Sequence, residues 1–362
     1  IFQCEIDITT GKRLTESRPI WKGSGGRYIE SPHMYHFGDW YYLMVAEGGT
    51  EYGHMVTYAR SKDPYGPFEA YAQNPVLTNR NLGGNENHIQ GIGHGDLIET
   101  PYGETFMVCL GFRIQSDWMP FHHLGREVFL VPVTWDKNGW FTAGVDGTVQ
   151  TVMDLPLKAS EQKINGRYDV SFETIKNELQ RFCHLREYHP ECYEFTENSV
   201  TLFGNRFTLN DTESPTFLGV RQSEFDTELT VSLTGNSPEA GITFYLSEEH
   251  HYDLAVLCKE KKRTLILRLR IGDAVMTAKE IELPEDAQII LKVVSDAAQY
   301  HFYGFINEEE ILLGSARTKY LSSEVAGGFT GVVMGMYAVN PNEDQKQKAQ
   351  FTNLYWKQGT DR

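Results

Sequence analysis

The sequence predicts an all-β protein, a partial β-propeller followed by a β-sandwich. Short apolar or alternating runs are separated by turn residues, for example Phe37-Gly38-Asp39 and Pro101-Tyr102-Gly103. This regular punctuation is typical of sandwiches, barrels and propellers. No long segment has a sustained helical period. A weak internal repeat fills the first half of the chain, and the pattern changes near Tyr168.

The repeat consists of two units, His33 to Gly66 and His94 to Gly139, and the central Met-Val pair recurs at positions 44 and 107. Each unit supplies about four antiparallel strands, the content of one propeller blade. Ahead of them, Ile1 to Ile8 and Arg18 to Trp21 are interpreted as outer strands of an earlier blade. A propeller needs about four to eight blades to close, so two and a half blades would leave bare sheet edges. We therefore expect a fragment, or a ring completed by another chain.

The second half reads as about a dozen short strand-like runs between Cys192 and Tyr355. That number is enough for two packed antiparallel sheets. We therefore assign residues 1–160 to the C-terminal blades of a propeller. Residues 161–362 are assigned to a β-sandwich of jelly-roll type.

Composition excludes some partners. The formal net charge of −16 over 362 residues argues against nucleic acid and anionic membranes, which attract basic patches. No run of about 18 apolar residues predicts a membrane helix. The five cysteines are scattered and lack metal-ligand spacing. We expect buried thiols in a reducing compartment, which favours a cytoplasmic location, although a chain that opens on Ile1 leaves localisation open.

The stretch Glu30-Ser31-Pro32-His33-Met34-Tyr35, before an aromatic-rich strand, is the most informative motif. Alone, an acid before a proline is most often a turn residue. The stretch resembles the Glu-Gly-Pro-His-like element of glycoside hydrolase family 43, the β-xylosidases and α-L-arabinofuranosidases. That resemblance implies that Glu30 is the general acid. From the sequence alone, we expect aromatic neighbours such as Tyr28 and Tyr35 to desolvate it. Ser31 stands where the family often has glycine.

The run from Ala46 to His54, with Glu47-Gly48-Gly49-Thr50 inside it, resembles the loop that follows this strand in the family. The resemblance implies that Thr50 lies close to the active site. The other reading is a Gly-Gly hairpin with polar flanks, and for Glu47 and Thr50 both readings stay open.

Gly93-His94-Gly95-Asp96 resembles the family's Gly-His-Ala-Asp element, whose histidine points into the propeller centre. We interpret His94 as a site-lining histidine. It has no His-rich companion at ligand spacing, so we expect no metal and no cofactor. Asp96 is expected to cap a turn or to pair with an arginine.

Gly125-Arg126-Glu127 resembles the family's Gly-Arg-Glu element, which implies that Arg126 contacts substrate. A guanidinium suits this role because it donates several fixed hydrogen bonds. Gly327-Gly328-Phe329-Thr330-Gly331 resembles a loop of the appended sandwich, and Phe329 is assigned to the active-site mouth. Without the resemblance, Arg126 would be an ordinary salt-bridge residue and Phe329 a core aromatic.

The resemblance covers essentially the whole chain and implies a five-bladed propeller with a concanavalin-like sandwich. It implies an inverting, exo-acting β-1,4-xylosidase or arabinofuranosidase that binds xylo- or arabino-oligosaccharides and forms a homo-oligomer. The family's general base and its second, pKa-tuning aspartate have no counterpart here, so little turnover is expected from this chain alone. The alternatives are a non-catalytic carbohydrate-binding or structural module and an all-β interaction protein without a sugar site.

Overall fold

The computed structural model describes residues 1–83, 88–115, 118–155, 168–260, 262–342 and 346–359. The chain divides into two compact units. Unit 1 comprises Ile1–Pro120 and Arg126–Gln162, and unit 2 comprises Phe121–Gly125 and Lys163–Arg362. The boundary expected between residues 160 and 161 lies outside the described residues.

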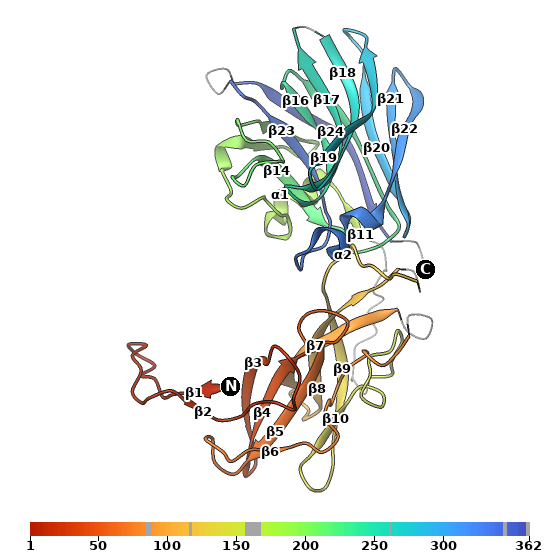
Figure 1. Ribbon diagram of the computed structural model, residues 1–362. Coiled ribbons are helices and arrows are strands. Elements are labelled where there is room, and N and C mark those ends of the chain that lie inside the picture. Colours follow the sequence, from red (N-terminus) through yellow and green to blue (C-terminus); the bar gives the residue numbers. More distant parts are fainter. Residues whose placement is uncertain (84–87, 116–117, 156–167, 261, 343–345, 360–362) are drawn as a thin grey trace. The chain divides into compact units, whose positions relative to one another are not determined.

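Unit 1 contains two four-stranded antiparallel sheets that match the two predicted blades (Figure 1). The first sheet has the order β3-β4-β5-β6 and the second the order β10-β9-β8-β7. Their bounds are β3 Glu30–Phe37, β4 Trp40–Glu47, β5 Met55–Ser61, β6 Glu69–Ala70, β7 Ile89–Glu99, β8 Thr105–Arg113, β9 Glu127–Trp135 and β10 Phe141–Ala143.

Both blades share one apolar core. Met44 and Met107, the residues that mark the repeat, are both buried in it. All seven residues of β5 are buried, so this strand is covered on both faces. That is the burial expected of a strand whose sheet packs against neighbours on each side. The repeat therefore reflects two equivalent sheets that pack against each other.

The N-terminal segment differs from the expectation of outer blade strands over 1–8 and 18–21. Only two short strands form there, β1 Phe2–Gln3 and β2 Arg18–Pro19, and they pair with each other. They lie to one side of the blade sheets (Figure 1). Ile8 is 94% exposed, so the apolar residues that suggested strands pack against little within the described residues.

Unit 2 is a β-sandwich of two antiparallel sheets. One has the order β12-β13-β24-β15-β20-β21-β22 with β11 also paired to β24, and the other has the order β14-β23-β16-β17-β18-β19. The bounds are β11 Tyr168–Val170, β12 Tyr193–Phe195, β13 Ser199–Phe203, β14 Thr216–Arg221, β15 Thr227–Gly235, β16 Glu239–Ser247, β17 His250–Lys259, β18 Lys262–Ile271, β19 Ala274–Leu283, β20 Ile289–Ser295, β21 Gln299–Ile306, β22 Glu309–Arg317, β23 Val333–Val339 and β24 Lys348–Gln358.

Helical segments are short. The two α-helices are α1 Phe172–Asn177 and α2 Ser323–Ala326, and 3-10 turns span Leu179–Arg181, Pro190–Cys192 and Thr318–Leu321. Helix α1 begins after Ser171, whose hydroxyl accepts a hydrogen bond from the backbone amide of Thr174. Among the described residues, no helix is long and apolar enough to cross a membrane.

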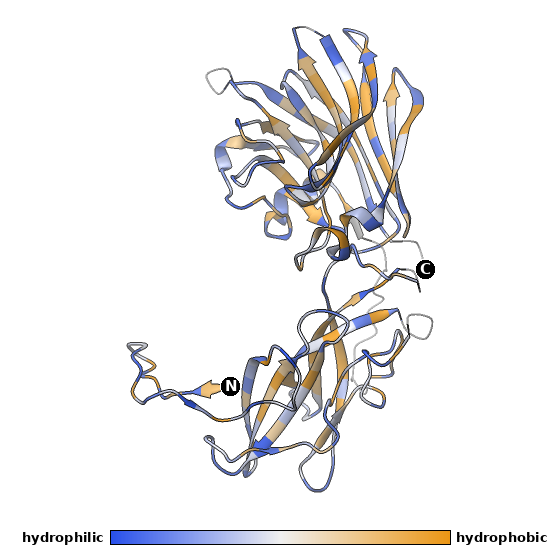
Figure 2. Ribbon diagram, viewed as in Figure 1, coloured by the Kyte–Doolittle hydropathy of each residue, from blue (hydrophilic) through white to orange (hydrophobic). Residues whose placement is uncertain are grey.

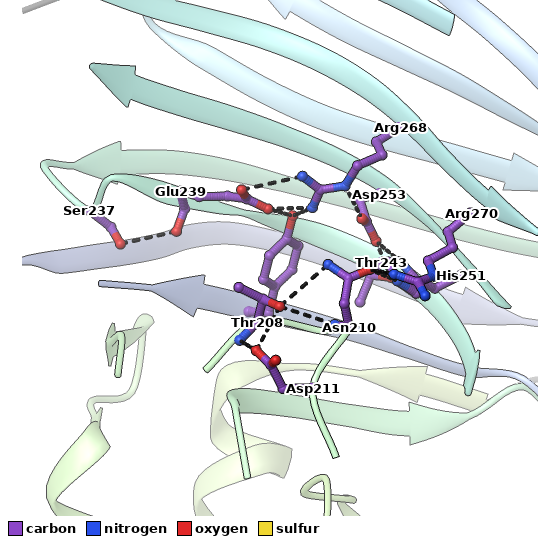
Figure 3. A network of polar contacts seen from close by, with 11 residues as sticks. Thr208, Asn210, Asp211, Ser237, Glu239, Thr243, His251, Asp253, Arg268 and Arg270 are labelled. Atoms are coloured by element: carbon purple, nitrogen blue, oxygen red, sulfur yellow. Dashed lines mark hydrogen bonds and ion pairs between the residues drawn. The ribbon is translucent and has the colours of Figure 1, made fainter. Parts of the chain in front are cut away.

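The sandwich core lies between the two sheets of unit 2 and contains most of its buried aliphatic residues. Apolar residues concentrate on the strands (Figure 2). The other face of the six-stranded sheet carries a smaller apolar cluster, which includes Phe217 and Tyr245, together with a polar network in which Asp253 and His251 are fully buried (Figure 3). Alternating side chains point to opposite faces of a strand, so this sheet buries an apolar face and a mixed apolar and polar face.

One segment of unit 2 comes from between two strands of the blades. Residues Phe121–Gly125 lie between β8 and β9 in sequence, yet they pack in unit 2. The carboxylate of Glu324 receives the backbone N–H of His122 at 3.0 Å and lies 2.7 Å from its Nδ1. The carbonyl of His123 accepts from the amide of Val332 at 2.9 Å. The sequence assignment, which gave all of residues 1–160 to one domain, did not foresee this insertion.

Candidate active site

Glu30 is the first residue of β3 and is exposed. It pairs with Ala46 of β4, and the register then shifts by a β-bulge before His33 pairs with Met44. Inside the bulge, Ser31 has a φ of +53°, a backbone conformation that favours glycine. Bulges re-aim side chains at functional sites. The structure thus explains why a glycine suits this position and shows that Ser31 adopts the same conformation.

The aromatic desolvation expected for Glu30 is not provided by its two candidate neighbours. Tyr28 is 65% exposed. The hydroxyl of Tyr35 instead donates to the carboxylate of Asp96 and accepts the backbone amide of Leu97 at 2.9 Å. Burial, followed by the hydrogen bond to Asp96, raises the pKa of Tyr35. Tyr35 is therefore committed to the contact between the two blades.

Glu47 is a buried anchor. Its side chain is fully buried, and its two carboxylate oxygens accept the amides of Ser24 at 2.7 Å and Gly26 at 2.6 Å. Thr57 Oγ1 also donates to it. A Cβ on Gly26 would lie 2.6 Å from the carboxylate. Glu47 therefore fixes the glycine-rich loop that leads to Glu30, which decides between its two readings in favour of a structural role.

His94 lies on β7 in a doubly bulged stretch. The pairing of β7 with β8 shifts register on both sides of Gly93, and His94 has a φ of +52°. Its Nδ1 lies 3.3 Å from the hydroxyl of Ser31, the residue after Glu30. This contact brings the candidate acid and the candidate site-lining histidine to the same end of the two blades.

Asp96 pairs with β3, although an arginine or a turn was expected. Its carboxylate accepts from Tyr35 and lies 3.5 Å from Nδ1 of His33. Residues 31, 33 and 35 alternate along β3, so their side chains share one face. That face lies against His94 and Asp96 of β7. Asp96 thus helps to hold the two blades together.

Arg126 directly precedes β9 and is exposed. The next residue, Glu127, forms a bidentate ion pair with Arg113 of β8, with N–O distances of 2.8 to 3.1 Å. In the Gly-Arg-Glu motif, the glutamate therefore ties β9 to β8, and the arginine stands at the end of the strand.

His54 lies in the same blade as Glu30, on the segment that leads into β5. It is fully buried, and its Nδ1 lies 3.0 Å from the carbonyl oxygen of Gly91. Burial lowers its pKa, the Gly91 carbonyl raises it, and the charges of His94, Glu30 and Arg126 also act on it. Three residues assigned from three separate motifs therefore lie within electrostatic reach of one imidazole.

Thr50 and Phe329 are the two remaining residues that the sequence assigned to the site. Thr50 is half-buried in the turn four residues before His54. Phe329 lies in unit 2 and is 57% exposed, so it is not a core aromatic. Its assignment to the mouth of the site stays a prediction, as does that of Thr50.

Sequence reasoning missed His54, although the motif that contains Thr50 ends on it. The glycines of β7, at positions 91, 93 and 95, could have indicated that a side chain packs against this strand. A Cβ on Gly93 would lie 2.4 Å from the His54 ring, so this glycine marks a place where a ring packs against backbone. Among the described residues, no group of three or more His, Cys, Asp or Glu side chains could hold a metal ion.

Comparison with known families matches both units. Residues 1–141 match the model of glycosyl hydrolases family 43, and residues 170–357 match the β-xylosidase C-terminal concanavalin A-like domain. The match to the second model supports the predicted concanavalin-like sandwich.

Among curated proteins, the chain is 36% identical to a non-reducing end α-L-arabinofuranosidase of Bacteroides ovatus, over 96% of this chain and 66% of that protein. It is 27% identical to a β-xylosidase of Bacillus subtilis, over 90% of this chain and 64% of that protein. The chain thus spans slightly less than two thirds of these relatives.

Solved structures superpose on both units of the chain. A Bacteroides ovatus protein described as xyloglucan PUL GH43B superposes with a TM-score of 0.87 at 34% identity, over 100% of this chain and 71% of that one. A xylan β-1,4-xylosidase of Bacillus halodurans gives a TM-score of 0.85 at 26% identity, over 98% and 70% of the two chains. From these matches and the shared motifs, the chain belongs to glycosyl hydrolase family 43.

Proposed function

We propose that this chain forms part of a glycosidase that releases pentose units from xylo- or arabino-oligosaccharides, with exo β-1,4-xylosidase as the preferred activity. In this proposal Glu30 is the general acid, and His94 and Arg126 contact the sugar. The observation that carries it is the contact between two of the motifs, in which Nδ1 of His94 lies 3.3 Å from the hydroxyl of Ser31, the residue after Glu30. The names of the relatives, an arabinofuranosidase and a β-xylosidase, support the substrate class.

The chemistry follows from the residue types. A general acid protonates the oxygen of the departing sugar, and the guanidinium of Arg126 suits binding to sugar hydroxyls. Glu30 is exposed in this chain. A bound sugar would remove water from its carboxyl group, and desolvation favours the protonated form that an acid catalyst needs.

An inverting reaction also needs a carboxylate that activates water, roughly 6.5–9.5 Å from the acid. Asp96 is the first candidate to test, because it lies two residues from His94 on β7. Its hydrogen bond from Tyr35 argues for a structural role instead. The expectation of little turnover by this chain stays a prediction that the same assay tests.

The test is to compare the chain with its Glu30→Gln variant on two substrates. One is xylobiose, whose leaving group needs a proton, and the other is an aryl xyloside, whose phenol departs without one. We expect Glu30→Gln to abolish any release from xylobiose and to reduce release from the aryl xyloside much less. Equal losses on both substrates would contradict the role of Glu30 as acid.

The alternative is a non-catalytic carbohydrate-binding or structural module. It predicts that the chain binds xylobiose, measured by titration calorimetry, and that neither substrate is cleaved at any protein concentration. Arg126→Ala would then weaken binding, whereas Glu30→Gln would leave turnover at zero.

A further inference from the structure

His54 uses only one of its two ring nitrogens within the described residues. Its Nδ1 lies 3.0 Å from the carbonyl oxygen of Gly91. Its Nε2 is buried and has no hydrogen-bond partner among the residues that the structure describes. A buried polar atom without a partner destabilises the fold, and such exceptions call for an explanation.

The contact with Gly91 assigns the tautomer. A carbonyl oxygen can only accept a hydrogen bond, so Nδ1 must carry a proton. Burial favours the neutral ring. In a neutral imidazole with a protonated Nδ1, Nε2 is an acceptor. The unpartnered atom therefore needs a donor.

Packing holds the ring in place. An added Cβ on Gly93 would come within 2.4–2.5 Å of Cγ, Cδ2 and Nδ1 of His54, so the backbone of β7 lies directly against the imidazole. The Thr78 hydroxyl donates to the backbone carbonyl of His54 at 2.7 Å. With both its ring and its backbone fixed, His54 cannot turn to satisfy Nε2 with a different neighbour.

The imidazole of His54 contacts the same stretch of β7 that carries His94. The charges that act on His54 belong to His94, Glu30 and Arg126. The carbonyl that it holds belongs to Gly91, three residues before His94 and at the start of the bulged stretch. His54 thus contacts the backbone that presents one site residue and lies near the charges of two others.

We propose that His54 is a positioning residue of the candidate site. Its Nδ1–H group fixes the bulge of β7 that carries His94, and its Nε2 accepts a hydrogen bond from a hydroxyl donor held beside that bulge. The donor is an O–H group, either an ordered water or a hydroxyl of the bound pentose. This inference rests on the proposed function for the identity of the sugar, but the tautomer does not depend on it.

Nitrogen-15 NMR of the full chain at neutral pH tests the tautomer. We expect a protonated Nδ1 and an unprotonated Nε2. A protonated Nε2, in either the other tautomer or the imidazolium, would overturn the proposal. Adding xylobiose then separates the two donors. A shift of the Nε2 resonance indicates a sugar hydroxyl, whereas an unchanged Nε2 beside a shifted His94 signal indicates water.

Two substitutions separate the two nitrogens. His54→Asn places an amide near Nδ1 and removes the Nε2 acceptor, so the Tm should stay close to that of the parent. Its affinity for xylobiose should fall roughly threefold to tenfold, the value of one hydrogen bond. His54→Gln places an oxygen near Nε2 and loses the Gly91 contact that fixes the bulge carrying His94, so the Tm should fall and the affinity of the folded fraction should fall as well. His301→Asn, in unit 2, serves as the control and should change neither.

The outcomes distinguish this inference from the proposed function. If both His54 variants bind xylobiose as the parent does, the role of Nε2 is wrong and the role of Glu30 is untouched. If the parent binds no xylobiose and no site signal moves, the proposed function fails. The tautomer measured in the sugar-free chain still decides the assignment of His54.

Discussion

Two fully buried histidines, His54 in unit 1 and His251 in unit 2, stand in opposite situations. His251 has a partner for each nitrogen: Nδ1 lies 2.9 Å from the Asp253 carboxylate, and Nε2 lies 3.2 Å from Oδ1 of Asn210. Among the residues that the structure describes, the ring of His54 has one hydrogen-bond partner, the carbonyl of Gly91. The two side chains are equally buried, but they differ in how many ring nitrogens have a hydrogen-bond partner.

The partners of His251 fix its protonation. Arg270 donates to the same Asn210 oxygen at 2.6 Å, so that oxygen is an acceptor and Nε2 must donate. Nδ1 must donate as well, because an ionised carboxylate only accepts. The network therefore uses His251 as a cation that links a sheet to the segment around Asn210 (Figure 3).

The network continues through Asp253. Its carboxylate also accepts from Thr243 at 2.7 Å and from Arg268 at 2.8 Å. Arg268 in turn pairs with Glu239, which accepts the hydroxyl of Tyr337 at 2.7 Å. Asp253 and Arg268 thus each face an opposite charge, whereas Arg270 contacts the neutral Asn210 amide and its buried Nε has no hydrogen-bond partner among the described residues. A buried imidazole with a partner for each nitrogen indicates a structural role, whereas one with an unpartnered nitrogen beside exposed charged residues points to a site.

The largest expected effect comes from breaking the complete network. Asp253→Asn removes the buried charge that compensates His251 and Arg268. Removing one partner of a buried ion pair costs roughly 3–5 kcal/mol. Urea unfolding of the chain, monitored on unit 2, measures this loss.

The matched control is Glu228→Gln. Glu228 pairs with Lys292 at 3.4 Å, with side chains 34% and 25% exposed, and such pairs contribute about 1 kcal/mol or less. If Asp253→Asn costs no more than this control, the buried network does not stabilise unit 2.

The two histidine environments also predict different pH windows. Burial alone would raise the pKa of Asp253, but His251, Arg268 and the hydrogen bonds outweigh it and lower the pKa to about 2. A carboxyl group with a lowered pKa stabilises the fold above its ordinary value of 3.8. That stability, roughly 2 kcal/mol, is lost as the pH falls towards 2.

The lowered pKa of His54 affects the free energy of unfolding in a higher pH range than that of Asp253. The unfolded chain takes up a proton below the ordinary value of 6.5, and the folded chain resists it. Unit 1 therefore loses stability as the pH falls below 6.5.

The measurement for both pH windows is the free energy of unfolding from pH 2 to 8, compared between the parent, His54→Asn and Asp253→Asn. His184 and His250 in unit 2 also have pKa values lowered by burial, so only differences between parent and variant are diagnostic. Identical pH profiles for parent and His54→Asn would contradict the assignment.

The sequence predicts the sheets well where apolar residues mark them. The Met-Val pairs locate β4 and β8, and the strand-like runs of the second half locate most strands of the sandwich. Two strands fall outside these runs: the three-residue β11 and β19, in which seven successive residues are exposed. An exposed edge strand has no buried face, so it lacks the apolar alternation that sequence analysis detects.

Three motifs assign Glu30, His94 and Arg126 to the candidate site, and these assignments stay predictions. The structure links two of the motifs through the 3.3 Å contact of the Ser31 hydroxyl with Nδ1 of His94. The roles of Glu47 and His54 were not assigned in advance, because they depend on partners distant in sequence, the amides of Ser24 and Gly26 and the carbonyl of Gly91. The insertion of residues 121–125 into unit 2 is also a long-range property.

A smaller effect should come from crowding His54. Gly93→Ala would place a Cβ 2.4 Å from the ring, and the ring is fixed by Gly91. Overpacking of this kind costs roughly 1–3 kcal/mol. The control is Gly83→Ala, since an added Cβ there meets nothing within 4 Å. Thermal unfolding should show a lower Tm for Gly93→Ala alone, and equal Tm values for both variants would mean that the ring can move.

The smallest effect concerns the bulge that presents Glu30. Ser31 has a φ of +53°, which a glycine adopts without strain. Ser31→Gly relieves that strain, but it adds flexibility to the unfolded chain and removes the hydroxyl 3.3 Å from His94. The net change in stability should stay within about 1 kcal/mol. Ser31→Val should be worse by roughly 1–2 kcal/mol, because a β-branched residue is strained at positive φ. Thermal unfolding ranks the variants, and xylobiose binding shows whether the bulge still presents Glu30. If Ser31→Val matches Ser31→Gly in both measurements, the bulge is not the element that sets the direction of Glu30, and the glycine common at this position in the family has another cause.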